Sequence, residues 1–166
     1  MDSSIQEQII NIVKEKFESE ILSTETPYDF LTFNLKQEKI TDIIRFLYDH
    51  PVGKFKYLTT LCGIHYPDVK QIAIMYQLHS LENNWRIRLK IYLPEENPVT
   101  PTITPIFSGA NWMERETYDF FGVKFTGHPD LRRILNVEDM IIFPLRKEYP
   151  LEDQTREDKS DLMFGR

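Results

Sequence analysis

Residues 71–93 read QIAIMYQLHSLENNWRIRLKIYL, and this stretch decides the fold. Apolar and polar residues alternate over 71–78 and again over 85–93, and a period of two is typical of a β-strand with one face in a core. The polar residues at 82–84 between the two runs have the composition of a hairpin turn. The stretch therefore predicts two neighbouring antiparallel strands.

Similar patterns extend outward from this hairpin. Apolar residues recur at every fourth position near the N-terminus, which is typical of an amphipathic helix, and period-two segments predict further strands. Four of the ten prolines lie in residues 94–105, so this segment is expected to be an extended connection. We predict helices over residues 4–22, 37–48 and 112–121, and strands over residues 28–35, 55–61, 71–78 and 85–93.

Together these elements predict an α+β protein of one domain. A chain of 166 residues and 19.8 kDa is long enough to bury a core of its own. We expect a mixed, mostly antiparallel sheet with helices packed on one face over residues 1–135. Residues 136–166 are expected to form an irregular, extended C-terminal segment that docks on partners, since the run at 152–159 is densely charged.

The charge balance disfavours nucleic-acid binding. Lys and Arg number 20 against 26 Asp and Glu, which gives a net charge of −6 and no overall basic field. The alternating Arg86, Arg88 and Lys90 are explained by the solvated face of a half-buried sheet. The apolar runs are about a quarter of the ~20 residues that a spanning helix needs, so membrane contact is expected only through a partner.

The cysteine and glycine counts argue against a cofactor in this chain. A single cysteine, Cys62, cannot form an internal disulfide, and one cysteine with four histidines cannot hold an iron–sulfur cluster or a c-type haem. A dinucleotide fingerprint is absent, and the Gly122 to Gly127 interval lacks the lysine of a phosphate loop. Cys62 and His65 are interpreted as a structural thiol and a turn histidine, without a metal.

The densest group of potentially reactive side chains lies in residues 112–135. An enzyme would use Glu114 or Glu116 as a general base with His128 as its partner. However, two residues that are two positions apart on a helix point about 200° away from each other. Glu114 and Glu116 are therefore poorly placed to share one site.

A structural interpretation uses the same residues differently. Asn111 would begin the helix, Glu114 would complete a capping box, and Arg115 would pair with Asp119 one turn later. Charges concentrated beside aromatic residues also suit a charge-complementary protein interface. That interface would account for the four residues left without a structural role: Glu116, His128, Arg132 and Arg133.

Residues 111–135 read NWMERETYDFFGVKFTGHPDLRRIL and resemble the signature of the thirty-kilodalton subunit of respiratory complex I. In bacteria this family supplies the C subunit of the NADH–quinone oxidoreductase. Residues 144–151, PLRKEYPL, resemble the closing motif of the family, with Glu148 in place of the usual aspartate. The resemblance covers roughly residues 28–151. One departure is Ile142-Phe143, where the family usually has Gly-His.

The resemblance implies a scaffold subunit without catalytic activity or cofactors of its own. It would belong to the hydrophilic arm of a proton-translocating NADH:quinone oxidoreductase, with flavin and iron–sulfur clusters in partner subunits. Its neighbours would be the quinone-site subunit, of the forty-nine-kilodalton type, and the iron–sulfur subunit beside it. The resemblance places nine residues at or under subunit contacts: Glu114, Arg115, Glu116, Asp119, His128, Arg132, Arg133, Arg146 and Lys147.

The same resemblance implies a peripheral position on the cytoplasmic side of a bacterial cytoplasmic membrane. The lack of a transit-peptide pattern favours a bacterial chain, although an organelle-encoded chain would look the same. Two alternatives stay open. The chain could be the equivalent subunit of a membrane-bound hydrogenase or of the plastid and cyanobacterial type of the complex. It could also be a free-standing enzyme that uses Glu116 and His128.

Overall fold

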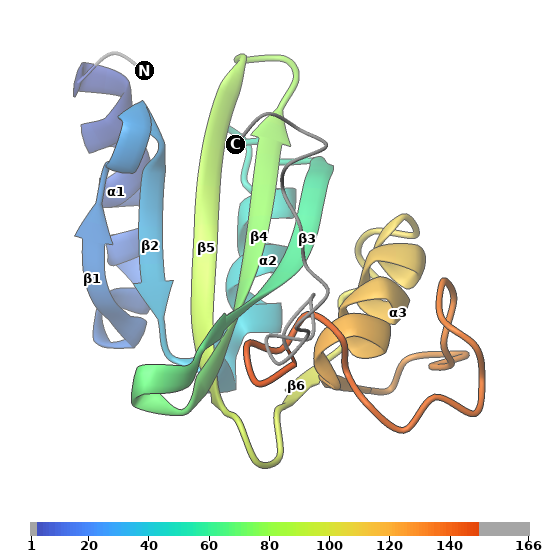
Figure 1. Cartoon of the computed structure of the whole chain (residues 1–166). Helices are drawn as coiled ribbons and strands as arrows, with labels where there is room; N and C mark the ends of the chain where they lie inside the picture. The colour runs from blue at the N-terminus through green and yellow to red at the C-terminus, as the bar shows by residue number, and fades with distance from the viewer. Residues whose placement is uncertain (1–2, 150–166) are drawn as a thin grey trace, which may run out of the picture.

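A five-stranded sheet forms the centre of the computed structural model, which describes residues 3–149 (Figure 1). The strand order is β1-β2-β5-β4-β3. Strands β2 and β5 run parallel, and the other neighbours run antiparallel, so the predicted mixed, mostly antiparallel sheet is confirmed. The strands are β1 (Ile21–Glu25), β2 (Leu31–Leu35), β3 (Tyr57–Tyr66), β4 (Gln71–Ser80) and β5 (Trp85–Pro94).

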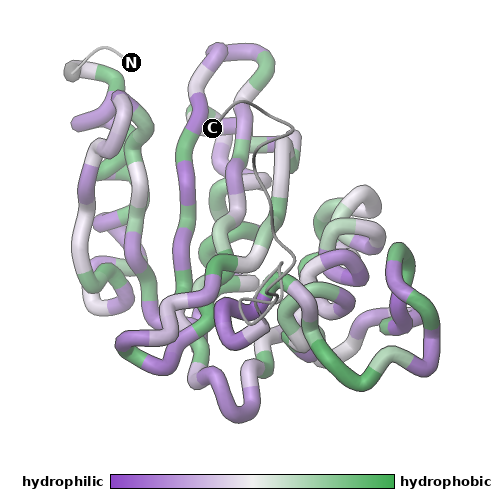
Figure 2. Tube along the Cα trace, in the orientation of Figure 1, coloured by the Kyte–Doolittle hydropathy of each residue, from purple (hydrophilic) through white to green (hydrophobic). Residues whose placement is uncertain are grey.

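Two helices, α1 (Ser3–Phe17) and α2 (Ile40–Asp49), cover one face of this sheet (Figure 1). Four aliphatic residues of α2 recur at helical spacing and are fully buried: Ile40, Ile43, Ile44 and Leu47. Strand β5 supplies the other side of the core through alternate residues, and Figure 2 shows this alternation of apolar and polar residues along the chain. The hairpin predicted from residues 71–93 is confirmed, with Leu78 opposite Ile87.

The polar face of β5 is less open than predicted. The Arg88 guanidinium lies 4.1 Å from the centre of the Phe30 ring, and Lys90 Nζ donates a hydrogen bond to the Tyr66 hydroxyl at 2.8 Å. Both side chains are half-buried because aromatic residues of neighbouring segments cover their stems. Of the three basic residues, Arg86 is exposed and the other two are half-buried, so the predicted solvated face is solvated only in part.

The N-terminal strand β1 was missed. The helical spacing seemed to continue to residue 22, but α1 ends at Phe17, whose ring packs on Phe46 of α2 at 5.5 Å. The following residues pair with β2 instead, with Ile21 opposite Leu35, since pairing across the sheet overrides local periodicity. A short parallel pair, β6 (Val99–Pro101) and β7 (Lys124–Thr126), was also missed because three residues carry no readable period.

The third helix, α3 (Ala110–Phe121), packs against β3 through a glycine. Gly63 lies opposite Ile74, and a Cβ atom at Gly63 would lie 2.6 Å from the ring of Phe121. The helix ends at Gly122 with φ +76, as predicted, but it begins at Ala110, so the Asn111 cap was wrong.

After β7 the chain forms no regular element up to residue 149 and runs beside α3 (Figure 1). We call residues 130–149 the strap. Residues 136–149 are irregular, as expected, and the remainder of the expected C-terminal segment, 150–166, lies outside the described residues. None of the helices between residues 3 and 149 is both long enough and apolar enough to cross a lipid bilayer.

Replacing Gly63 by alanine should loosen α3, because the added methyl group overlaps the Phe121 ring. Overpacking of this kind costs about 1–3 kcal/mol, which corresponds to a fall in Tm of roughly 3–10 °C. Thermal unfolding followed by circular dichroism measures it. Gly109→Ala is the matched control, since nothing lies within 4 Å of a Cβ there, and equal melting of the two variants would contradict the expectation.

Candidate partner interface and the buried charges beneath it

The carboxylate of Asp119 on α3 holds the strap. It is fully buried and accepts a hydrogen bond from Arg133 Nη1 at 2.7 Å. It also accepts backbone N–H bonds from Leu135 at 2.8 Å, Asn136 at 2.9 Å and Ile134 at 3.2 Å. Burial alone would raise the pKa of Asp119, but these amides and the guanidinium outweigh it and hold that pKa well below its usual range.

Arg133 binds residues further along the strap. Its guanidinium donates to the backbone carbonyls of Asp119, Met140 and Ile142, and its centre lies 5.2 Å from the centre of the Phe143 ring. One buried ion pair thus fixes strap residues from 133 to 142. The predicted pairing of Arg115 with Asp119 was wrong, because the strap supplies Asp119 with a closer cation.

Further contacts fasten both ends of the strap. Arg115 donates to the backbone carbonyls of Arg132 and Arg133 at 3.2 and 3.1 Å. Arg146 Nε donates to the carbonyl of Phe121 at 2.8 Å, and the backbone N–H of Lys147 donates to His65 Nδ1 at 2.9 Å.

His65 lies in β3, so its assignment to a turn was wrong. Its side chain is almost fully buried, and its other ring nitrogen, Nε2, lies 3.2 Å from a carboxylate oxygen of Glu95.

Phe143 occupies the position at which the sequence departs from the family pattern. Its ring lies between two guanidinium groups, with Arg146 at 5.0 Å from the ring centre, and it contacts the ring of Tyr118 edge-on at 6.3 Å. A Cβ atom at Gly122 would come within 2.6 Å of this ring. The aromatic side chain therefore packs between the strap and the end of α3, where only a glycine leaves enough space.

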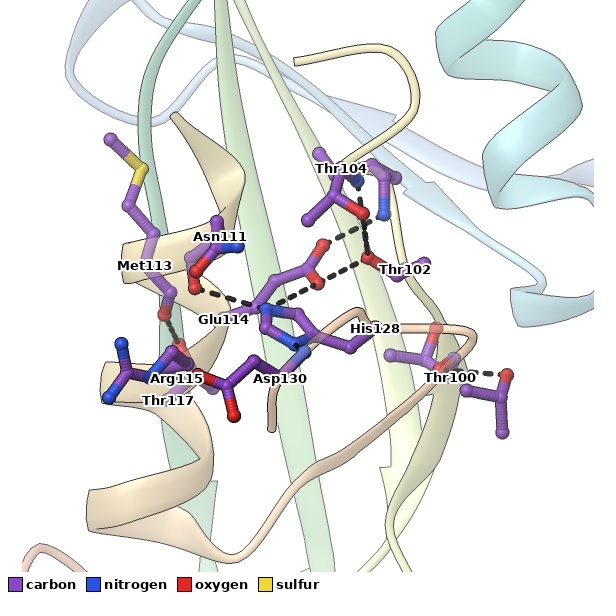
Figure 3. Close-up of polar contacts among 12 residues, drawn as sticks. Thr100, Thr102, Thr104, Asn111, Met113, Glu114, Arg115, Thr117, His128 and Asp130 are labelled. Atoms are coloured by element: carbon purple, nitrogen blue, oxygen red, sulfur yellow. Dashed lines mark hydrogen bonds and ion pairs between the residues drawn. The ribbon is translucent and has the colours of Figure 1, made fainter. Parts of the chain in front are cut away.

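Glu114 is buried beneath the other end of α3 (Figure 3). Its carboxylate accepts hydrogen bonds from Thr102 Oγ1 at 2.5 Å and from the backbone N–H of Ile103 at 2.8 Å. Burial raises the pKa of Glu114 to about 7, although both hydrogen bonds favour the charged form. The predicted capping role was wrong, since the side chain points into the segment after β6 and bonds no amide of its own helix.

His128 lies beside Glu114 and links two other segments (Figure 3). Its Nε2 is 3.1 Å from the carbonyl oxygen of Asn111 and 3.9 Å from the Glu114 carboxylate, and its Nδ1 accepts the backbone N–H of Asp130 at 3.0 Å. Because Nδ1 is an acceptor, the ring proton sits on Nε2 and the imidazole is neutral. This assignment of the tautomer follows from the hydrogen-bond geometry.

Three of the nine predicted interface residues point outward. Glu116, Arg132 and Lys147 are exposed, and Arg132 makes only an exposed pair with Asp130 at 2.9 Å. Within the described part of the chain, no hydrogen bond or ion pair engages the side chain of Glu116 or Lys147. The other six use their side chains inside the molecule: Glu114, Arg115, Asp119, His128, Arg133 and Arg146.

Helix α3 and the strap also expose large apolar side chains that the sequence analysis missed. Ile141 on the strap is 92% exposed, and Trp112 on α3 is 58% exposed. Apolar exposure of this kind, bordered by charges, is typical of protein–protein interfaces. Besides these two, the exposed apolar residues of the strap are Leu135, Val137 and Leu145. A hollow between α3 and the strap, of about 550 Å³, is lined by Tyr118, Leu131, Arg132, Arg133, Glu138, Met140, Ile141 and Phe143.

The arrangement gives little support to catalysis by Glu116 and His128. The carboxylate within 4 Å of His128 is that of Glu114, and Glu116 faces solvent, as the opposed orientation of the two glutamates predicted. Both nitrogens of His128 already have backbone partners. Among residues 3–149 no three metal-ligating side chains of the His, Cys, Asp or Glu type come together.

Residues 33–155 match the family model described as "Respiratory-chain NADH dehydrogenase, 30 Kd subunit". The chain belongs to this family. Three relatives, each named as a C subunit of NADH-quinone oxidoreductase, illustrate the range of sequence identity. The C 2 subunit of Rhizobium etli is 40% identical over 140 residues, covering 84% of this chain and 74% of that protein. The relative from Roseiflexus sp. is 45% identical (73% and 70% covered), and that from Geobacter sulfurreducens 37% (87% and 90%).

Two solved structures share the fold of this chain. The trypsin-resistant fragment (1–134) of Nqo5 is 28% identical, with a TM-score of 0.62 over 75% of this chain and 98% of that fragment. A chain of the membrane-bound sulfane sulfur reductase, an archaeal respiratory membrane complex, is 23% identical, with a TM-score of 0.75 over 92% of this chain and 96% of that one. The second likeness concerns the fold alone.

Asp119→Asn should destabilise the protein strongly, because it leaves the buried Arg133 guanidinium without a counter-charge. Breaking a buried pair in this way costs about 3–5 kcal/mol, measured as the free energy of unfolding in urea. The matched control is Asp130→Asn, which removes an ion pair whose side chains are 63% and 54% exposed and should cost less than about 1 kcal/mol. Equal losses in both variants would show that Asp119 does not hold the strap.

Acid should act on the same ion pair. Since folding lowers the pKa of Asp119 below its ordinary 3.8, its contribution to stability is complete above that pH and is lost as the pH falls further. Urea unfolding at pH 7, 4 and 3 should therefore show the difference between the wild type and Asp119→Asn shrinking toward low pH. A difference that stays constant over this range would contradict the assigned role.

Proposed function

We propose that this chain is a structural subunit of a membrane-associated NADH–quinone oxidoreductase and has no catalytic group or cofactor of its own. The proposal rests on what the charged residues of the signature motif do in the structure. Asp119 and Arg133 fasten an irregular strap to α3, and the strap and helix together expose apolar side chains such as Ile141 and Trp112. This arrangement builds a rigid contact surface.

The partners follow from the family. In this proposal the surface formed by α3 and the strap meets the quinone-site subunit and its iron–sulfur neighbour. The flavin and the clusters belong to partner subunits, and the chain reaches the cytoplasmic side of the membrane only through them. The exposed Glu116, Arg132 and Lys147 lie on α3 and the strap and would find their counter-charges across the contact.

The direct test is to tag the chain in its native host, extract membranes in mild detergent and identify its companions by native gel and mass spectrometry. Co-migration with an NADH-oxidising, quinone-reducing assembly is the expected result. Co-migration with hydrogenase or other reductase subunits would assign the chain to a related machine. Recovery of a lone protein, with turnover that depends on Glu116 and His128, would overturn the proposal in favour of the free-standing enzyme.

Ile141→Asp should prevent assembly without unfolding the chain, because this side chain is 92% exposed before any partner binds. A charge buried at the centre of an interface typically costs at least about 2 kcal/mol, so the assembled fraction should fall more than about tenfold. Leu81→Asp is the matched control, since Leu81 is 67% exposed in the β4–β5 hairpin, away from the strap (Figure 1). Assembly of the Ile141 variant at the control level would place the contact elsewhere.

A further inference from the structure

Glu114 is a fully buried carboxyl group without a permanent counter-charge. Among residues 3–149, no lysine or arginine lies within 4.0 Å of it, and the nearest ionisable nitrogen is His128 Nε2 at 3.9 Å. Removing a charge from water without an ion-pair partner is unfavourable, so the buried group favours its neutral form.

The hydrogen bonds of His128 prevent it from supplying the missing charge. A protonated ring would carry a hydrogen on Nδ1, and this hydrogen would point at the backbone N–H of Asp130, only 3.0 Å away. The observed geometry therefore requires a neutral ring that donates from Nε2 toward the carbonyl of Asn111. Charging His128 means breaking its bond to Asp130.

The other groups around the site do not balance a negative charge either. Tyr76 of β4 lies close enough to Glu114 to feel its charge, and burial raises the pKa of its hydroxyl far above the usual range. The buried Tyr76 hydroxyl interacts with the Thr100 hydroxyl of β6, and neither hydroxyl makes a hydrogen bond to Glu114 within the described residues. Ile103 contributes one backbone N–H from the segment after β6. The pocket can therefore solvate a carboxylate only partly.

Glu114 and His128 join three separate parts of the chain (Figure 3). Glu114 ties α3 to residues 102–103, while His128 ties the start of α3, through Asn111, to Asp130 at the first residue of the strap. The two side chains meet at the point where the strap leaves β7.

We propose that Glu114 and His128 form a proton-dependent latch on the start of the strap. With the Glu114 proton in place, the neutral pair holds the turn 127–130 against α3. When that proton is lost to solvent, the uncompensated buried carboxylate favours an opening of the pocket to water. This opening releases the turn, whereas Asp119 and Arg133 keep the later part of the strap in place. The inference does not depend on the identity of the partner subunits.

The test uses the full chain with ¹³C-labelled glutamate and ¹⁵N-labelled histidine, studied by NMR from pH 5 to 8.5. The Glu114 carboxyl should titrate with a midpoint near 7. Amide exchange, corrected for its intrinsic pH dependence, should show that the protection of the Asp130 amide falls about tenfold between pH 6 and 8. The amide of Leu135, which binds Asp119, should keep its protection.

Glu114→Gln should make the protection of Asp130 independent of pH, because a neutral amide replaces the titrating group. Glu116→Gln, on the exposed side of the same helix, is the matched control and should behave as the wild type. A Glu114 midpoint near the ordinary 4.5, or the same loss of protection in Glu114→Gln, would overturn the latch. If Glu114→Gln does not fold, the titration of the Glu114 carboxyl in the wild type decides the question alone.

Discussion

Twenty residues of the strap have no strand or helix to satisfy their backbone polar groups, and the ion pair of Asp119 with Arg133 does part of this work. The carboxylate accepts three amide N–H groups and the guanidinium donates to three carbonyls. Burying two opposite charges is tolerable when hydrogen bonds surround both. The strap keeps one path beside α3 because these bonds fix it, and its exposed apolar side chains keep their positions for the same reason.

Two glycines leave the space in which α3 packs against the sheet and against the strap. Gly63 leaves room for the Phe121 ring beneath the helix, and Gly122 both ends the helix with a left-handed conformation and leaves room for Phe143. The charged residues of the signature and the two glycines therefore act together. The glycines leave room for the rings of Phe121 and Phe143, and the pair of Asp119 with Arg133 holds the strap beside α3.

The sequence predicted those helices, strands and turns whose formation depends on consecutive residues. The β4–β5 hairpin, α2 and the end of α3 were readable because alternation, helical spacing and a terminal glycine are properties of consecutive residues. Strand β1 was not, since its pairing with β2 overrides a helical spacing. The roles of Glu114 and Asp119 were missed for a related reason: their partners, Thr102 and Arg133, are 12 and 14 positions away. The sequence showed where the charges lie but not that most of them point inward.

The parallel pairing of β2 with β5 also has a consequence for how the chain is made. Strands β3, β4 and β5 follow one another and pair as antiparallel neighbours, so they can form as soon as they are synthesised. Leu31 of β2 pairs with Ile87, 56 positions later. During translation, the edge of β2 that later pairs with β5 therefore has no partner strand until β5 has left the ribosome. The pairing of β2 with β5 is thus possible only after all five strands of the sheet have been synthesised.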